Sequence, residues 1–173
     1  MLVPATDMGL IATHLSAHDG LIAKIKMHEK KVESEELKYV LNKKLDLLRS
    51  HVRLMMEMLD PAKSDFQEVP SLDELPSGNQ PVGKVQNASQ LDKHIALETK
   101  KAAESMALDN FISALKMQDP KVKHAHVQFA LQEIEIIKDV TEILKEVGAE
   151  ITPLGTEEEQ QKIMRHFEHI LNE

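Results

Sequence analysis

The sequence predicts an all-α protein, and three observations lead to this fold class. Aromatic residues make up only 3% of the 173 residues, with one tyrosine and no tryptophan, whereas β-sheets favour aromatic side chains. The apolar residues are instead mainly Leu, Ile, Met and Ala, which suit helical cores. They recur every three or four positions along several long segments, which is the spacing of one helix face.

The first two helices are expected to form a hairpin over residues 7–60. Asp7 is the predicted N-cap of the first helix, which runs to about Lys31. Ser34 is the predicted cap of the second helix, and Pro61 ends it because proline cannot continue a helix. The short turn between the helices makes them antiparallel. The apolar stripe of the second helix comprises Leu37, Leu41, Leu45, Leu48, Val52, Met55 and Leu59.

Residues 61–88 lose the helical period and are rich in proline and glycine. They are either a disordered linker between two domains or a crossover that lies along one bundle. The crossover is favoured because a lone helical hairpin has nothing against which to bury its apolar face. The side chains expected to hold the crossover against the bundle are Phe66, Val69, Leu72 and Leu75.

The second hairpin is predicted over residues 89–148. Ser89 and Asp92 form a variant of the capping box at its start. Asp119 followed by Pro120 marks an N-cap and first helical position, and Gly148 is a natural end for the last helix. The expected apolar stripes are Leu91, Ile95, Ala102, Leu108, Ile112 and Leu115 in the third helix, and Phe129, Ala130, Ile134, Ile137, Val140 and Leu144 in the fourth.

A short C-terminal helix is predicted over residues 156–172, with Thr156 and Glu159 as its capping box and Ile163, Phe167 and Ile170 facing inward. Residues 1–173 thus form one predicted domain: two antiparallel hairpins joined by a long crossover, plus a fifth helix. This is the connectivity of ferritin-like four-helix bundles. A bundle exchanged between two protomers fits the same sequence.

Charge and composition exclude several classes of function. The formal net charge of −8 repels a phosphate backbone, so no nucleic-acid partner is expected. No stretch approaches the ~20 apolar residues of a membrane span. The first ten residues lack the basic and apolar regions of a secretory signal, and the absence of cysteine suits a reducing compartment. The sequence therefore predicts a cytoplasmic protein without disulfides.

The second hairpin has four recognisable features: the Asp92 entry, Lys100-Lys101, the Asp119-Pro120 turn followed by Lys123, and the helix end at Gly148. In these features it resembles the hairpin of the spore coat protein F-like family of endospore-forming bacteria, and the stretch HLSAHDGLIAKIKMHEKK resembles the family's other half. In place of the Gly-Trp-Tyr-like end found in family members, this chain has Gly148 followed by Ala149 and Glu150. The resemblance implies a ferritin-like bundle with a structural role in the spore coat, alone or with other coat proteins. It implies no catalytic residues.

Di-iron bundles require Glu-x-x-His on two helices, and this requirement is not met. The second helix has Leu48 where the glutamate should precede His51, and the fourth helix lacks the motif. An oxidase is therefore disfavoured, and the chain is predicted not to be an enzyme.

Nine histidines are unusual for a chain of this length, and some of them are expected to meet. His14 and His18 lie one helical turn apart on the apolar face of the first helix, a spacing at which two imidazoles can share a metal. At the same level along the bundle axis as His14 and His18, we expect His51 of the second helix, residues 105–109 of the third and residues 131–133 of the fourth. The candidate metal ligands are His14, His18, His51, His126 and Glu133.

Two hypotheses follow for this layer. In the first, the histidines hydrogen-bond to one another and to nearby polar groups in the core of a non-enzymatic structural protein, which is expected to form a homodimer. In the second, the layer holds zinc or iron for storage, sensing or oxidation. A further pair with metal-ligand spacing, His94 and Glu98, is expected to lie away from the layer.

Overall fold

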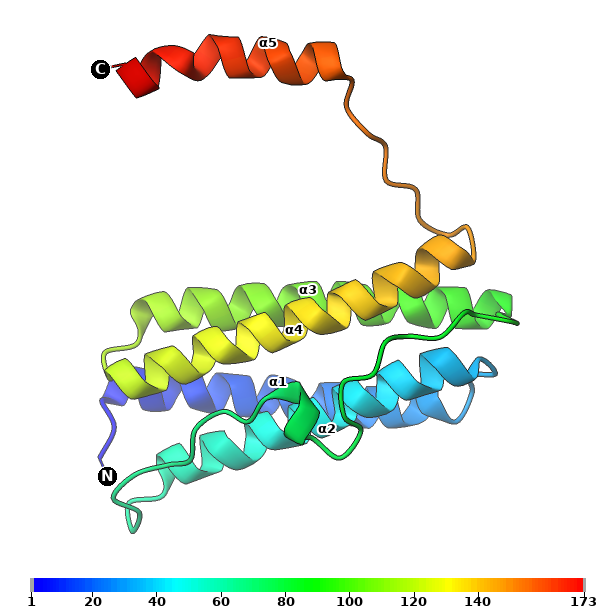
Figure 1. The fold of residues 1–173 in the computed structure, drawn as a ribbon. Coiled ribbons are helices and arrows are strands. Elements are labelled where there is room, and N and C mark those ends of the chain that lie inside the picture. Colours follow the sequence, from blue (N-terminus) through cyan, green and yellow to red (C-terminus); the bar gives the residue numbers. More distant parts are fainter. Residues whose placement is uncertain (1, 173) are drawn as a thin grey trace.

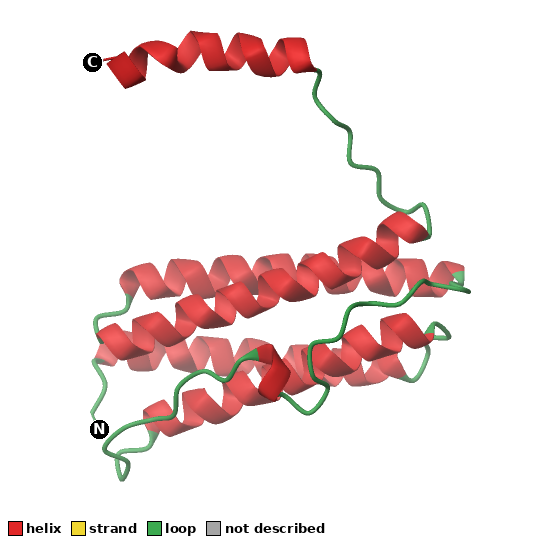
Figure 2. Cartoon of the chain, viewed as in Figure 1, coloured by secondary structure: helices red, strands yellow, loops and turns green. Residues whose placement is uncertain are grey.

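The computed structural model describes residues 2–172, which form five α-helices and two short 3₁₀ helices and contain no strand (Figures 1 and 2). The predicted all-α class is confirmed. The helices are α1 (Ala5–Glu29), α2 (Glu35–Leu59), η1 (Leu72–Glu74), α3 (Gln90–Lys116), α4 (Pro120–Glu146), α5 (Glu157–Phe167) and η2 (Glu168–Asn172).

Helices α1 and α2 form the first antiparallel hairpin, and α3 and α4 form the second (Figure 1). The second hairpin packs on the first, with α2 against α4 and α1 against α3. Between the hairpins, residues 60–89 run the length of the bundle, interrupted only by η1 (Figure 2). Phe66, Leu72 and Leu75 are buried there and Val69 partly so, which confirms the residues expected to hold the crossover.

The predicted helix caps are present in all but one case. The Ser34 hydroxyl accepts from the Leu37 N–H, and Asp119 caps α4 with Pro120 in its first turn. Ser89 with Asp92 and Thr156 with Glu159 form complete capping boxes. Gly148 adopts φ +67° after α4, the left-handed conformation that a helix end of this kind requires of a glycine.

Asp7 is the exception, and its prediction as an N-cap is wrong. Helix α1 begins two residues earlier, after Pro4, and Asp7 lies buried inside the first turn. Its two carboxylate oxygens accept from the backbone N–H groups of Gln118 and Asp119, each at 2.9 Å. Asp7 therefore fastens the α3–α4 turn to the start of α1.

Asp92 has the matching position at the other end of the bundle. It lies in the first turn of α3 and accepts from the backbone N–H of Glu33, in the α1–α2 turn, at 3.0 Å. Each hairpin thus begins with an aspartate that fastens the turn of the other hairpin. These two contacts fix how far the hairpins slide past each other.

The apolar core consists of two clusters along the bundle axis. One surrounds Leu41, Leu48 and Val140, and the other surrounds Ile11, Met55 and Phe129. Polar side chains lie between them.

The predicted apolar stripe of α3 is largely wrong as a core face. Of its six residues only Ile95 is buried, while Leu91, Leu108, Ile112 and Leu115 are exposed. The buried face of α3 carries small and polar residues instead, so the large apolar side chains point outward. In α4, the prediction holds for Phe129, Ala130, Val140 and Leu144 but not for Ile134, which is 47% exposed.

Helix α5 exists as predicted but does not cover the bundle. A connector after α4 carries it away from the four packed helices (Figure 1). Every residue from 151 to 171 is exposed, including Ile163, Phe167 and Ile170, which were expected to face inward. Within residues 2–172, no helix combines the length and apolarity needed to cross a membrane.

Candidate functional site

Histidines from three helices meet in the layer between the two apolar clusters. His14 and His18 on α1, His51 on α2 and His126 on α4 are each at most 5% exposed. Their ring centroids are separated by 5.2 Å (His14–His126), 5.5 Å (His18–His51) and 6.4 Å (His14–His18). The structure thus brings together His14, His18 and His51, which were expected at one level, and adds His126, which was a candidate ligand but was not expected at that level.

The contacts of His18 and His51 link α1, α2 and α4. Nδ1 of His18 lies 2.7 Å from the backbone carbonyl oxygen of His14, and its Nε2 lies 3.3 Å from Nδ1 of His51. Nε2 of His51 lies 2.7 Å from Oε1 of Gln132, whose amide nitrogen donates to the Pro70 carbonyl. The chain of contacts thus runs from α1 to the crossover.

His14 and His126 form the other half of the layer. Nε2 of His14 lies 2.9 Å from the Ser113 hydroxyl of α3. Nδ1 of His126 lies 3.0 Å from the Val122 carbonyl, whereas its buried Nε2 has no hydrogen-bond partner. The expected α3 contribution from residues 105–109 is only partly correct. Ser105 and Asp109 are exposed, although the charge of Asp109 still acts on His14, and Ser113, about two turns further along, faces the layer.

Glu133 points into the bundle as predicted but does not join the histidines. Its Oε2 accepts from Nζ of Lys44 at 2.5 Å, and both side chains are fully buried. Its Oε1 is buried without a hydrogen-bond partner. A second ion pair, Lys43 with Asp139 at 2.7 Å, lies beside it.

These two buried lysines were not predicted from the sequence, although the sequence carries a signal for one of them. Lys44 lies three residues after Leu41 and four before Leu48, in the middle of the α2 apolar stripe. A lysine is almost never buried unless an opposite charge accompanies it, so its position in an apolar stripe predicts a buried partner. That partner is Glu133. His51 continues the same stripe and is fully buried.

Burial controls the protonation of the layer. It lowers the pKa of His18 to about 4 and that of His126 to about 4, and it holds the pKa of His51 well below its ordinary value. Burial also lowers the pKa of His14, against the attraction of Asp109. The pKa of Glu133 is raised by burial, which outweighs the opposing effect of Lys44. At neutral pH the histidines are therefore uncharged.

The five predicted metal ligands do not form one ligand set: the four histidines share one layer, whereas Glu133 pairs with Lys44. Among residues 2–172, no three His, Asp or Glu side chains are arranged to hold a metal ion. His94 and Glu98 lie apart from the layer, as expected: Glu98 pairs with Lys24 and with His28 at the bundle surface. Comparison with protein-family models, with curated proteins and with solved structures finds no match to this chain, so its function must be argued from these side chains and from its surface.

Proposed function

We propose that this chain is a non-enzymatic structural protein that assembles with copies of itself. In the assembly, α5 of one copy packs on the outer surface of α3 and α4 of another. The observation that carries the proposal is that one chain exposes both an apolar helix and an apolar helix face. Monomeric proteins rarely leave such surfaces uncovered.

The first of these surfaces, here called the outer apolar face, lies on the second hairpin. At 100° per residue, its α3 members fall on one side of the helix, opposite the buried side. Its α4 members likewise point away from the core. Their exposed fractions run from 41% to 75%. The face consists of Leu97, Leu108, Phe111, Ile112 and Leu115 on α3 and of Leu131 and Ile134 on α4.

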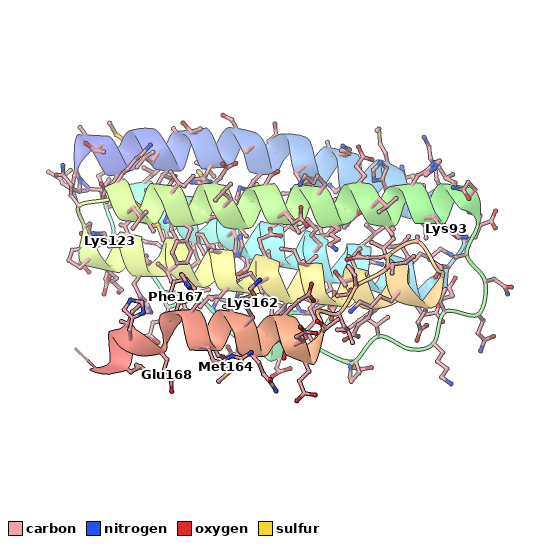
Figure 3. All side chains as sticks on the ribbon, turned by 90° about the horizontal axis from the view of Figure 1, so that it is seen from above. Lys93, Lys123, Lys162, Met164, Phe167 and Glu168 are labelled. Atoms are coloured by element: carbon pink, nitrogen blue, oxygen red, sulfur yellow. The ribbon has the colours of Figure 1, made fainter. Side chains whose placement is uncertain are left out.

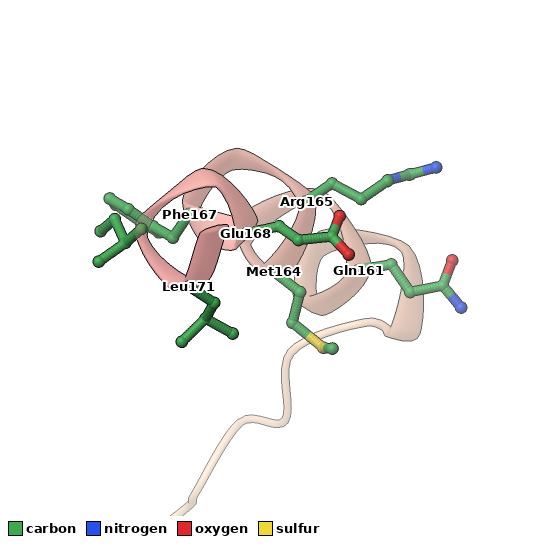
Figure 4. Close-up of a pocket in the computed structure, with 7 residues that line it drawn as sticks. Gln161, Met164, Arg165, Phe167, Glu168 and Leu171 are labelled. Carbon is green, nitrogen blue, oxygen red and sulfur yellow. The ribbon is translucent and has the colours of Figure 1, made fainter. Parts of the chain in front are cut away.

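The second surface is α5 with η2. Met164, Phe167 and Leu171 project from this segment, with Gln161, Arg165 and Glu168 around them (Figure 4). Ile163 and Ile170 are also exposed, at 59% and 57%. Seen from above, Met164 and Phe167 lie on a helix outside the four packed helices (Figure 3). A short amphipathic helix of this kind is stabilised chiefly by packing against a partner.

A second copy is the partner that fits this arrangement. Helix α5 is held away from its own bundle, so the outer apolar face stays open to another chain. Lys116, Lys123 and Lys138 are exposed beside the face. Helix α5 begins with three exposed glutamates, Glu157, Glu158 and Glu159, which complement these lysines. Two chains that exchange α5 make the same contact twice and form a closed two-fold dimer.

A ferritin-like bundle in a spore coat is the setting that we propose for this assembly. The resemblance of the second hairpin to coat protein F-like proteins supports it, and so do the two hairpins joined by a crossover that runs the length of the bundle. A non-enzymatic role is supported by the histidine layer, whose side chains are enclosed between the helices and offer no surface to a substrate. We propose a cytoplasmic protein that is incorporated into the coat.

Sedimentation equilibrium over a range of concentrations tests the proposal. The wild-type chain should have the mass of two chains at high concentration and dissociate on dilution. Removal of residues 151–173 should leave a monomer, and so should the double substitution of Ile112 and Leu115 by lysine. The matched control is Met56→Lys, which changes an apolar side chain with a similar exposure of 57% on α2 and should dimerise normally.

Two results would overturn the proposal. One is a wild-type chain that stays monomeric at every concentration. The other is a dimer that survives removal of residues 151–173, because α5 would then have no part in assembly.

A further inference from the structure

The His18–His51 contact contains an unusual arrangement of lone pairs. The partner of Nδ1 in His18 is a backbone carbonyl oxygen, which can only accept, so this nitrogen must carry the hydrogen. In a neutral imidazole the other nitrogen is then an acceptor. Nε2 of His18 therefore presents a lone pair to His51.

The same reasoning applies to His51 from the other side. The side-chain NH₂ group of Gln132 donates to the carbonyl of Pro70. The side-chain oxygen of Gln132 is therefore the atom that faces His51. Nε2 of His51 must therefore donate to Gln132, and Nδ1 of His51 is an acceptor. Two lone pairs thus face each other across 3.3 Å, with no hydrogen between them.

Such an arrangement requires an electrophile between the two nitrogens. A shared proton would hold the two nitrogens closer together, at the ~2.7–2.9 Å of a charge-assisted hydrogen bond. The separation of 3.3 Å suits a metal, because two nitrogens bound tetrahedrally to zinc at ~2.0–2.1 Å lie about 3.3 Å apart. Uncharged imidazole is also the form that binds a metal.

A third nitrogen is available in the same layer. His126 is fully buried, and its Nε2 has no hydrogen-bond partner. The centroid of the Phe129 ring lies 4.0 Å from that of His51 and 5.2 Å from that of His126, so this ring contacts both groups. His14 also connects them, since its ring centroid lies 5.2 Å from that of His126 and 6.4 Å from that of His18.

We propose that His18 Nε2 and His51 Nδ1 form the fixed half of a binding site for a divalent transition metal, zinc above all, and that His126 turns to complete it. The site needs this rotation because three ligands are not yet in place in the described part of the chain. Glu133 is not part of this site, since Lys44 holds it. This inference does not depend on the proposed assembly, because it concerns the interior of a single bundle.

The test uses the full chain without an affinity tag, at pH 7.5, with zinc ion as the probe. One sample of protein is incubated with zinc chloride. A second is unfolded and refolded with zinc chloride, so that a buried site is filled even if zinc enters the folded bundle slowly. The zinc bound per chain is measured after desalting. One zinc per chain is expected. His18→Gln and His51→Gln should each weaken binding by at least about tenfold, since even changes around the ligands have effects of that size. His124→Gln, which changes an exposed histidine of α4, should bind as the wild type does.

Nitrogen NMR of the histidine rings keeps the test decisive if a substitution prevents folding. In wild-type protein, zinc should shift the resonances of His18 Nε2, His51 Nδ1 and His126 Nε2, and leave those of His124 unchanged. The proposal is overturned if neither preparation retains zinc. It is also overturned if zinc shifts only exposed histidines, or if the metal-free protein shows a proton shared between His18 and His51 at this pH.

Discussion

The interior layer of the bundle and the outer side of α3 have exchanged the residues that each would ordinarily carry. Inside, His18, His51, Lys44 and Glu133 are fully buried. Outside, Leu108 and Leu115 are 60% and 75% exposed on a helix of the same bundle. A helical period therefore identifies the faces of a helix but does not determine which face lies inside the bundle.

Helix α3 shows the physical reason. Its buried face carries Ala96, Ala103 and Ala114, whose small side chains let the backbone of α3 lie close to its neighbours. The stripe of larger apolar residues would hold the helices further apart. In a closely packed bundle the small face therefore turns inward, and the large apolar residues are left for a partner.

The largest effect should come from the buried ion pair. Glu133→Ala leaves the charge of Lys44 buried without its partner, which should lower the free energy of unfolding by about 3–5 kcal/mol. Combining it with Lys44→Met removes both charges and should restore most of the stability. Urea unfolding measures both, with Glu142→Ala on the exposed side of α4 as the control. If the single and double variants are equally unstable, the loss does not come from an unpaired charge.

The second largest effect should come from acid, which lowers the free energy of unfolding because it protonates the buried histidines. The pKa of His18 is 6.5 in the unfolded chain and falls to about 4 on burial. Between these values the unfolded state binds more protons, so the stability is complete above pH 6.5 and is lost as the pH falls toward 4. One such histidine contributes on the order of 3 kcal/mol. Glu133 acts in the opposite direction, because its raised pKa adds stability that is lost as the pH rises through it.

Urea unfolding at a series of pH values measures this dependence. His18→Gln should make the profile less steep between pH 6.5 and 4 without removing the slope, because the pKa of His126 is also lowered to about 4, whereas His124→Gln should not change it. A wild-type stability that stays constant over this range would mean that His18 is not buried in its neutral form.

The hydrogen bonds that Asp7 accepts from the α3–α4 turn should contribute somewhat less to the free energy of unfolding. Asp7→Ala leaves the backbone N–H groups of Gln118 and Asp119 without their acceptors, so the free energy of unfolding should fall by about 2 kcal/mol. Asp19→Ala, at an exposed position of the same helix, is the control and should change it by less than about 0.5 kcal/mol. Equal thermal midpoints for the two variants would show that Asp7 does not hold the turn.

The smallest effect on folding should come from the outer apolar face. Leu115→Ala should change the unfolding of the monomeric bundle by less than about 0.5 kcal/mol, since the side chain is 75% exposed. Ile95→Ala on the same helix should lower it by about 2–5 kcal/mol because Ile95 is buried. Similar losses at both positions, measured in a chain that lacks residues 151–173, would show that the stripe of α3 is a core face after all.

The sequence predicted the helices and their ends well because caps are local. Ser34, Ser89, Asp119 and Thr156 act on backbone groups within their own helix. Asp7 was misassigned because its partners lie in a turn more than a hundred residues away. The histidine layer was predicted from helix faces and relative heights, but its contacts were not. Whether Gln132 or Glu133 meets His51 depends on a single residue of register, which no pattern in the sequence sets.

Hydrogen–deuterium exchange of α5 as a function of protein concentration decides whether the exposed apolar surfaces serve assembly. At low concentration the amides of residues 157–167 should exchange as rapidly as those of a free helix. At high concentration they should become protected together with the part of α3 around Leu108 and Leu115. Protection that does not depend on concentration would place α5 on its own bundle, and no protection at any concentration would leave both surfaces without the partner proposed for them.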